Sequence, residues 1–121
     1  MTAQAQYKIR IQRVYEDLEP EDGERFLIDR LWPRGISKSK LSSVEWLRDV
    51  APSVELRKWF DHDPAKWDEF RKRYHRELSA NEGQVAALKA ELKKGAVTLV
   101  YGAKDEVHND AVVLKEFLKT Y

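Results

Sequence analysis

Cysteine is absent from this sequence, and its absence excludes disulfide bonds, thiolate metal ligands and a cysteine nucleophile. The same absence is compatible with the reducing cytoplasm, which is the compartment that we expect. Neither a glycine-rich phosphate loop nor a Gly-x-Ser-x-Gly elbow occurs, so no familiar motif names a reaction. A signal peptide and an apolar run of membrane-spanning length are absent as well, and we expect no membrane partner.

Charge of one sign is not in excess, because 22 Lys and Arg residues nearly balance 21 Asp and Glu residues for a formal charge of +1. This balance argues against wholesale attraction to nucleic acid or membranes, although it leaves room for a local basic patch. The 121 residues, of which 42% are hydrophobic and 36% charged, predict one globular domain over residues 1–121. Its first six residues are expected to be frayed.

The segment 25–35 carries the most informative pattern in the chain. Its apolar run, Phe26 to Ile28, is typical of a strand that is buried on both faces. The Pro-Arg-Gly sequence that closes the segment must end this strand, since proline removes a backbone donor. Arg30 and Arg34 therefore lie at or just past the end of a core strand, where open α/β sheets usually hold their ligands.

Hydrophobic periodicity predicts the other elements of secondary structure. Strands are expected over residues 7–15, 44–50 and 97–103, and helices over 54–60, 64–78, 85–92 and 112–118. Ser53 and Asp63 are suitable N-caps for the first two helices. This pattern predicts a small α/β domain of about four strands with flanking helices, whose two central buried strands are parallel. The direction of the first strand stays open.

If the two buried strands are parallel, polar side chains from both strand ends face each other across one crevice. Arginine and lysine side chains, together with the free N–H groups at the start of the last helix, are typical of an anion site. We therefore predict a pocket for phosphate, a phosphate ester, a nucleotide or a carboxylate. Its ligand-binding residues are expected to be Arg30, Trp32, Arg34, Lys104 and Asn109.

A histidine near the second strand end leaves catalysis open. His108 follows Asp105 by three residues, and an imidazole that titrates near neutral pH suits general acid–base chemistry. These two are the candidate catalytic residues. Two plainer interpretations also stay open: Asp105 or Asn109 caps the last helix, and the arginines brace their loop. No histidine has metal-ligand spacing to a partner, so neither a metal nor a cofactor is predicted.

Three segments occur in a characteristic order. They are Asp29-Arg30-Leu31-Trp32-Pro33-Arg34-Gly35, then Ala51-Pro52-Ser53 with Leu56-Arg57-Lys58-Trp59-Phe60, and last Ala103-Lys104-Asp105 with His108-Asn109. Together they resemble the YeaO-like group of bacterial proteins, which belongs to the domain of unknown function family 488. The resemblance covers nearly the whole chain and implies a small three-layer α/β domain in the bacterial or archaeal cytoplasm, without supplying a function.

The same resemblance limits what can be transferred from the family. Longer relatives carry a Cys-His-Arg turn after the last strand. This chain has Glu106-Val107-His108-Asn109-Asp110 at that place, so thiol chemistry suggested for those relatives does not transfer.

The function that the sequence favours is binding of a small anion at the ends of the two buried strands, with catalysis open. The first alternative is a nucleic-acid-binding module that uses the basic helix 64–78. Arg71, Lys72, Arg73 and Arg76 lie on the surface of this helix that its aromatic residues leave free. Acidic residues dilute its charge, and aromatic residues at helical spacing are more often part of a core. The second alternative is a protein-interaction module that uses exposed aromatics such as Trp32.

Overall fold

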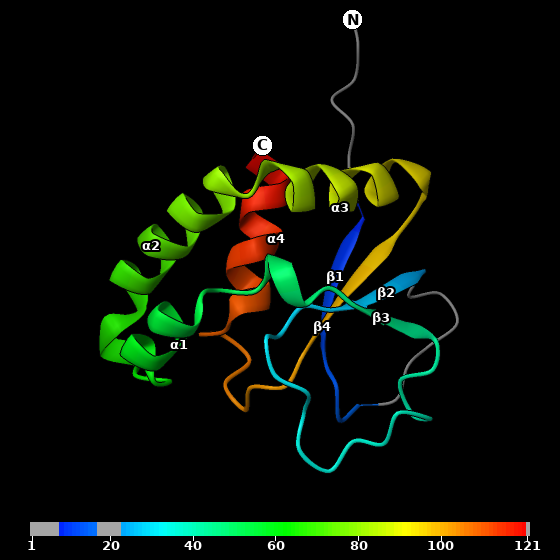
Figure 1. Cartoon of the computed structure of the whole chain (residues 1–121), viewed down its shortest axis with the longest axis horizontal. Helices are drawn as coiled ribbons and strands as arrows, with labels where there is room; N and C mark the ends of the chain where they lie inside the picture. Colours follow the sequence, from blue (N-terminus) through cyan, green and yellow to red (C-terminus); the bar gives the residue numbers. More distant parts are fainter. Residues whose placement is uncertain (1–7, 17–22, 121) are drawn as a thin grey trace, which may run out of the picture.

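A computed structural model describes residues 8–16 and 23–120 of the chain. The strands in this part are β1 (Ile9–Arg13), β2 (Glu24–Leu27), β3 (Val44–Trp46) and β4 (Val97–Tyr101) (Figure 1). The helices are η2 (Arg48–Val50), α1 (Val54–Phe60), η3 (Pro64–Lys66), α2 (Trp67–Ala80), α3 (Glu82–Lys94) and α4 (Asp110–Thr120), of which η2 and η3 are short 3-10 helices. The segment 1–6, for which fraying was expected, lies outside the described residues.

All four strands pair in parallel in one sheet, in the order β1-β4-β2-β3. The two strands that the sequence predicts to be buried are neighbours, with Phe26 opposite Leu99 and Leu27 opposite Val100. Their parallel direction and the α/β class with about four strands are therefore confirmed. β1, whose direction the sequence left open, is parallel to β4. Because all the strands point the same way, their carboxyl ends meet at one edge of the sheet.

The two faces of the sheet are covered by different kinds of structure. Phe26 and Leu99 belong to the main core, which they share with buried residues of α1, α2, α3 and α4. Leu27 and Val100 belong to a smaller core on the opposite face, against which Trp32 and Trp46 pack. The connection 28–43, which contains no helix or strand, covers this second face. The sheet therefore has helices on one face and the connection 28–43 on the other.

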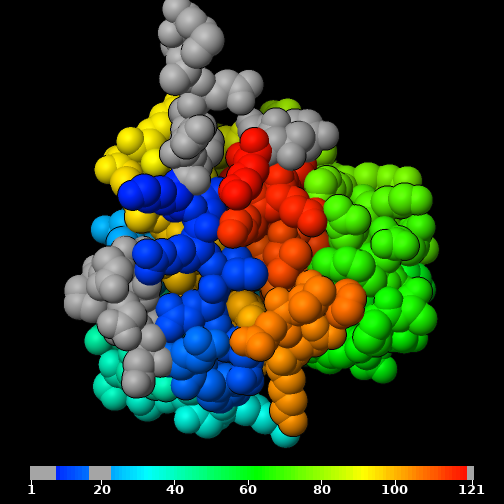
Figure 2. All heavy atoms as spheres, turned by 180° about the vertical axis from the view of Figure 1, so that it is seen from behind, coloured from blue at the N-terminus to red at the C-terminus, as the bar shows by residue number. Residues whose placement is uncertain are grey.

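The helical layer is built around α4, which packs on β1 and β4 and is itself covered by α2. Figure 2, seen from behind, shows α4 in red between β1 in blue and α2 in green. The completely buried Tyr74 of α2 donates its hydroxyl hydrogen to the carbonyl oxygen of Val50 at 2.7 Å, which ties η2 to this layer. In the part of the chain that the structure describes, no helix has both the length and the hydrophobicity needed to cross a membrane.

The end of the third strand and the start of the second helix differ from the sequence prediction. The third strand, expected over 44–50, ends at Trp46, because the backbone N–H groups that follow donate to carbonyl groups three residues earlier and form η2. The helix expected over 64–78 begins as the 3-10 turn η3 before α2 starts. Both predicted N-caps are confirmed, because the side chain of Ser53 accepts the N–H of Leu56 and that of Asp63 accepts the N–H of Ala65.

Candidate functional site

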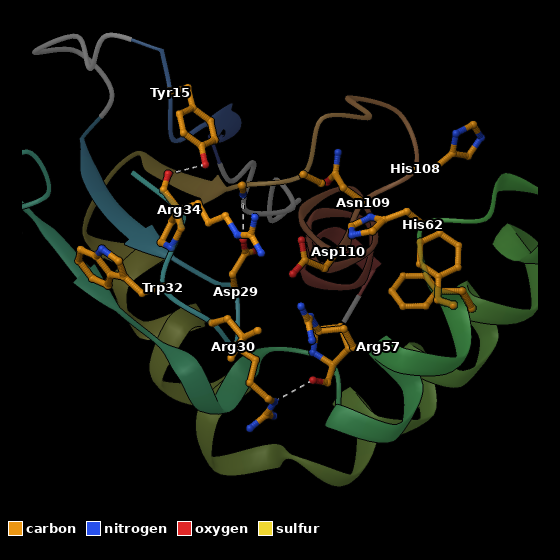
Figure 3. A pocket seen from close by; sticks show the side chains of 17 residues that line it. Tyr15, Asp29, Arg30, Trp32, Arg34, Arg57, His62, His108, Asn109 and Asp110 are labelled. Carbon is orange, nitrogen blue, oxygen red and sulfur yellow. Dashed lines mark hydrogen bonds between the residues drawn. The ribbon is translucent and has the colours of Figure 1, made fainter. Parts of the chain in front are cut away.

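A cavity of about 390 Å³ opens at the carboxyl ends of β2 and β4 (Figure 3). Its walls come from the segment after β2, from α1 and the turn after it, and from the loop between β4 and α4. The polar and aromatic residues labelled in Figure 3 line it: Tyr15, Asp29, Arg30, Trp32, Arg34, Arg57, His62, His108, Asn109 and Asp110. Parallel sheets commonly hold ligands at this edge.

Two carboxyl groups lie at the centre of this cavity (Figure 3). Asp29 follows β2, Asp110 is the first residue of α4, and their side chains are hydrogen-bonded to each other. Asp29 Oδ2 also accepts the backbone N–H of Gly102 at 2.8 Å. The charges of Arg57 and His62 reach Asp29 as well. The pair therefore links the end of β2 to the start of α4 and to the backbone after β4.

The carboxyl pair holds a proton more tightly than separate aspartates would. Burial raises the pKa of Asp110 well above its ordinary value of 3.8, and the neighbouring charge of Asp29 raises it further. Burial also raises the pKa of Asp29, although the hydrogen bonds from Asp110 and Gly102 oppose this change. Asp110 consequently donates a hydrogen bond to Asp29 for as long as the pair holds a proton.

Three basic side chains surround the carboxyl pair. Arg34 comes from the segment after β2, Arg57 from α1 and His62 from the turn after α1, and all three point into the cavity in Figure 3. Among the described residues, neither arginine side chain forms an ion pair or donates a hydrogen bond. Their guanidinium groups are therefore available to a bound oxyanion.

The turn that presents His62 has an uncommon backbone conformation. Asp61 and His62 have φ angles of 46° and 55°, in the left-handed region that residues other than glycine rarely adopt. Asp61 ends α1 by donating its N–H to the carbonyl oxygen of Arg57 at 3.1 Å. The chain then reverses, and His62 becomes part of the cavity wall. Strained residues of this kind are typical of functional sites.

Arg30, a predicted ligand-binding residue, lines the cavity. Its guanidinium group donates two hydrogen bonds to backbone carbonyl groups of the protein. Its Nε donates to the carbonyl oxygen of Pro52 at 2.9 Å, and its Nη2 donates to that of Ala51 at 3.2 Å. These bonds fit the interpretation of a brace, with backbone carbonyl groups in place of the carboxylates that were considered. They join the segment after β2 to the start of α1.

Trp32 also lines the cavity and contributes to the smaller core. Its Nε1 donates to the carbonyl oxygen of Ile36 at 2.7 Å, and its ring meets Trp46 edge-on at 5.3 Å between centroids. The residue is half-buried, so it offers less surface to a protein partner than an exposed tryptophan would.

The candidate catalytic residues form a local unit in the loop between β4 and α4. Asp105 Oδ2 lies 2.8 Å from His108 Nδ1, and Asp105 Oδ1 accepts the N–H groups of His108 and Val107 at 2.9 Å each. These bonds, the backbone N–H of His108 first among them, lower the pKa of Asp105 to about 2. The His108 ring packs edge-on against Trp67 at 5.1 Å, at the edge of the cavity and away from the carboxyl pair (Figure 3).

Asn109 and Lys104 have different positions. Asn109 is buried and caps α4, because its Oδ1 accepts the N–H of Val112 at 3.0 Å while its Nδ2 donates to the carbonyl oxygen of Asp105 at 2.9 Å. Its capping role is thus confirmed, and its ligand contact stays a prediction. Lys104 is exposed and is not among the described residues that line the cavity.

Comparison with known proteins places the chain in a family. A family model described as the inactive DUF488-N3 subclade matches residues 8–121. The chain belongs to this DUF488 subclade. The uncharacterised protein YeaO of Escherichia coli K12 is 42% identical over 112 residues, which cover 93% of this chain and 97% of YeaO. The uncharacterised protein Rv3073c of Mycobacterium tuberculosis H37Rv is 41% identical over 111 residues, which cover 92% of this chain and 93% of the relative.

These findings confirm the resemblance to the YeaO-like group that the sequence motifs indicated. No solved structure matches the chain. The cavity of this DUF488 protein is therefore interpreted from its own residues.

The basic residues of α2, which the nucleic-acid alternative requires, differ in their availability. Two arginines pair with carboxylates at 2.9 Å, Arg71 with Glu116 and Arg73 with Glu69. The two others, Lys72 and Arg76, are exposed. Two of the four basic side chains of α2 are therefore paired with carboxylates in the part of the chain that the structure describes.

Four acidic or basic residues that line the cavity were not among the predicted site residues: Asp29, Arg57, His62 and Asp110. Asp29 follows β2 and Asp110 begins α4, so both residues lie at the element ends where the sequence predicts the site. Neither residue was nevertheless predicted to belong to it. Arg57 lies in the second family motif, and His62 depends on a left-handed turn that no local pattern reveals. Within residues 8–16 and 23–120, no group of three or more His, Asp and Glu side chains is arranged to hold a metal ion.

Proposed function

We propose that this protein binds a small anion, such as a phosphate, a phosphate ester or a carboxylate, in the cavity at the carboxyl ends of β2 and β4. The observation that carries this proposal is the pair of guanidinium groups, Arg34 and Arg57, which enter the cavity from two elements without an ion-pair partner among the described residues. A guanidinium group binds an oxyanion through two parallel hydrogen bonds. Two such groups that line one cavity give a bound oxyanion two sets of donors.

Binding rather than catalysis is the role that we infer. The description of the subclade as inactive supports this choice. The position of the unit formed by Asp105 and His108 supports it as well, because His108 lies at the edge of the cavity. A general acid or base must come within hydrogen-bond distance of the proton that it transfers.

A nucleic-acid-binding module has less support. The basic side chains of α2 are partly neutralised by Glu69 and Glu116. Binding to a polyanion through many phosphate contacts must weaken steeply with salt, whereas a single phosphate in a pocket responds much less. The salt dependence of binding therefore separates the two functions.

Isothermal titration calorimetry with inorganic phosphate and methyl phosphate, at constant ionic strength, tests the proposal. We expect Arg34→Gln and Arg57→Gln each to weaken binding about tenfold or more, because a hydrogen bond to a charged group contributes roughly 1.5–3 kcal/mol. Lys58→Gln is the matched control, since Lys58 is exposed next to Arg57 on α1 and does not line the cavity.

Equal losses in all three variants would indicate non-specific attraction and would contradict the proposal. Absence of binding by the wild-type protein would contradict it too. If DNA or RNA binds instead, and Lys72→Gln with Arg76→Gln abolishes that binding while Arg34→Gln leaves it unchanged, the nucleic-acid function replaces the proposed one.

A further inference from the structure

The cavity contains groups of both charge signs, and this combination restricts what it can bind. We propose that its ligand is a phosphorylated polyhydroxy compound, such as a sugar phosphate, with the phosphate at Arg34 and Arg57 and hydroxyl groups at Asp29 and Asp110. This inference rests on the proposed function, because it names the class of anion that the same cavity accepts.

Acidic and basic side chains line the same cavity. Asp29 and Asp110 line the same cavity as the two arginines, yet no ion pair joins a carboxyl to a guanidinium group among the described residues. The two carboxyl groups bond to each other and to the Gly102 N–H instead. Oxygen lone pairs that face the cavity are therefore left to accept hydrogen bonds from a ligand.

Anions with and without hydroxyl groups interact differently with this arrangement of charges. An anion without hydrogen-bond donors gains from the arginines but is repelled by the carboxylate of Asp29. An anion that also carries hydroxyl groups places its charge on the arginines and donates its O–H groups to the carboxyl pair. A hydrogen bond with an ionised acceptor is stronger than a neutral one. The cavity consequently favours hydroxylated anions over bare ones.

The size and the walls of the cavity also favour a sugar phosphate. Its volume of about 390 Å³ falls in the range of pockets for small organic molecules and is far more than one phosphate ion needs. Phe60 and Phe70, whose rings stack at 4.3 Å between centroids, supply an apolar part of the wall. A sugar ring has apolar C–H faces and polar edges, so it matches a cavity with one apolar wall and one carboxyl pair.

The proton of the carboxyl pair supports the same ligand. Burial and the charge of Asp29 raise the pKa of Asp110, so the pair gains its second negative charge only at a higher pH than two separate aspartates would. The repulsion of a nearby phosphate is reduced accordingly, while Asp29 keeps its capacity to accept hydrogen bonds.

Calorimetric titration with three phosphate esters that differ in their hydroxyl groups tests the inference on the wild-type protein. Glucose 6-phosphate and ribose 5-phosphate carry hydroxyl groups, and cyclohexylmethyl phosphate has a ring and a phosphate without them. We expect at least one of the two sugar phosphates to bind ten times more tightly than cyclohexylmethyl phosphate. Equal affinity of all three compounds would overturn the inference.

Variants of the carboxyl pair give the second test. Asp110→Asn keeps the size of the side chain and a donor toward Asp29, and Asp29→Asn keeps an acceptor for the Gly102 N–H. We expect Asp29→Asn to lose the preference for the sugar phosphate and to bind cyclohexylmethyl phosphate at least as well as the wild type. If Asp29→Asn fails to fold, Asp29→Ser, which also removes the charge of this side chain, must lose the preference, whereas Asp110→Asn should keep it because asparagine retains a donor and an acceptor. An unchanged preference in the folded Asp29 variant would overturn the inference.

The two proposals fail in different ways. If inorganic phosphate and cyclohexylmethyl phosphate bind, and Arg34→Gln weakens both, but hydroxyl groups add no affinity, then the inference fails and the proposed function stands. If no phosphate compound binds, both fail together. Lys58→Gln serves as the control here as well, and its affinities should equal those of the wild type.

Discussion

The carboxyl group of Asp110, which begins α4, is hydrogen-bonded to the carboxyl group of Asp29, which follows β2. This bond joins the first residue of a helix to the end of a central strand, in the cavity that Arg34 and Arg57 also line. A buried pair of acids reduces the stability of a fold when both ionise, because like charges repel and lose hydration. The fold retains the pair at the cavity, which is consistent with a role in binding.

Replacing Asp110 by asparagine should stabilise the protein, and the gain should depend on pH. The pKa of Asp110 is raised in the folded protein above 3.8, so the wild type loses stability as the pH rises from 3.8 through the raised pKa. Asp110→Asn has no such titration. Urea unfolding from pH 3.5 to 8 should show a difference in unfolding free energy that grows with pH in favour of the variant. A difference that stays constant would show that the group is not perturbed.

Loss of Arg30 should destabilise the fold more than a surface substitution does. Arg30→Ala removes two donors to the carbonyl groups of Ala51 and Pro52 and is expected to lower the unfolding free energy by roughly 1.5–3 kcal/mol. Lys58→Ala, at an exposed site of α1, should change it by less than about 0.5 kcal/mol. Equal effects of the two substitutions would show that the hydrogen bonds of Arg30 do not stabilise the fold.

Asp105 should support the fold only while it is ionised. Its pKa is lowered from 3.8 to about 2, so its contribution is present above pH 3.8 and is lost as the pH falls toward 2. Asp105→Asn should therefore be less stable than the wild type at neutral pH, and the two proteins should converge in acid. Chemical unfolding at intervals between pH 2 and 6 measures this convergence.

The buried strands were predictable, but the end of the third strand was not. Apolar runs such as Val97 to Tyr101 need burial on both faces, which only a central strand provides. The alternating residues 44–50 satisfy a strand equally well along their whole length. The strand nevertheless ends at Trp46, where the chain turns into η2. The hydroxyl of Tyr74 holds η2 by donating to the carbonyl group of Val50, a contact between distant residues that a local pattern does not contain.

The site was predictable only in part, for a similar reason. Arg30 and Arg34 could be placed near the cavity because they follow a buried strand. The meeting of Asp29 with Asp110 depends on how α4 starts over the sheet, and the position of His62 depends on a left-handed turn. Lys104 was predicted as a ligand-binding residue from its closeness in sequence to β4, but it is exposed and is not among the described residues that line the cavity.

Arg34 should act on the ligand and not on the fold. Its side chain is exposed toward the cavity, and the hydrogen bond that Tyr15 donates to this residue uses only the backbone carbonyl oxygen, at 2.9 Å. Arg34→Lys should keep the melting temperature and weaken phosphate binding by roughly 1.5–3 kcal/mol, because lysine cannot reproduce a bidentate contact. A large drop in melting temperature with unchanged affinity would make Arg34 a structural residue.

The most direct test of anion binding in the cavity is an NMR titration of the ¹⁵N-labelled protein with methyl phosphate at constant ionic strength. The backbone N–H of Gly102, which is bonded to Asp29, and the Nε–H groups of Arg34 and Arg57 report on the cavity. We predict that these signals shift in a saturable manner, while the backbone signals of Lys72 and Arg76 on α2 stay in place. Shifts confined to α2, or no saturable shift at all, would contradict the account.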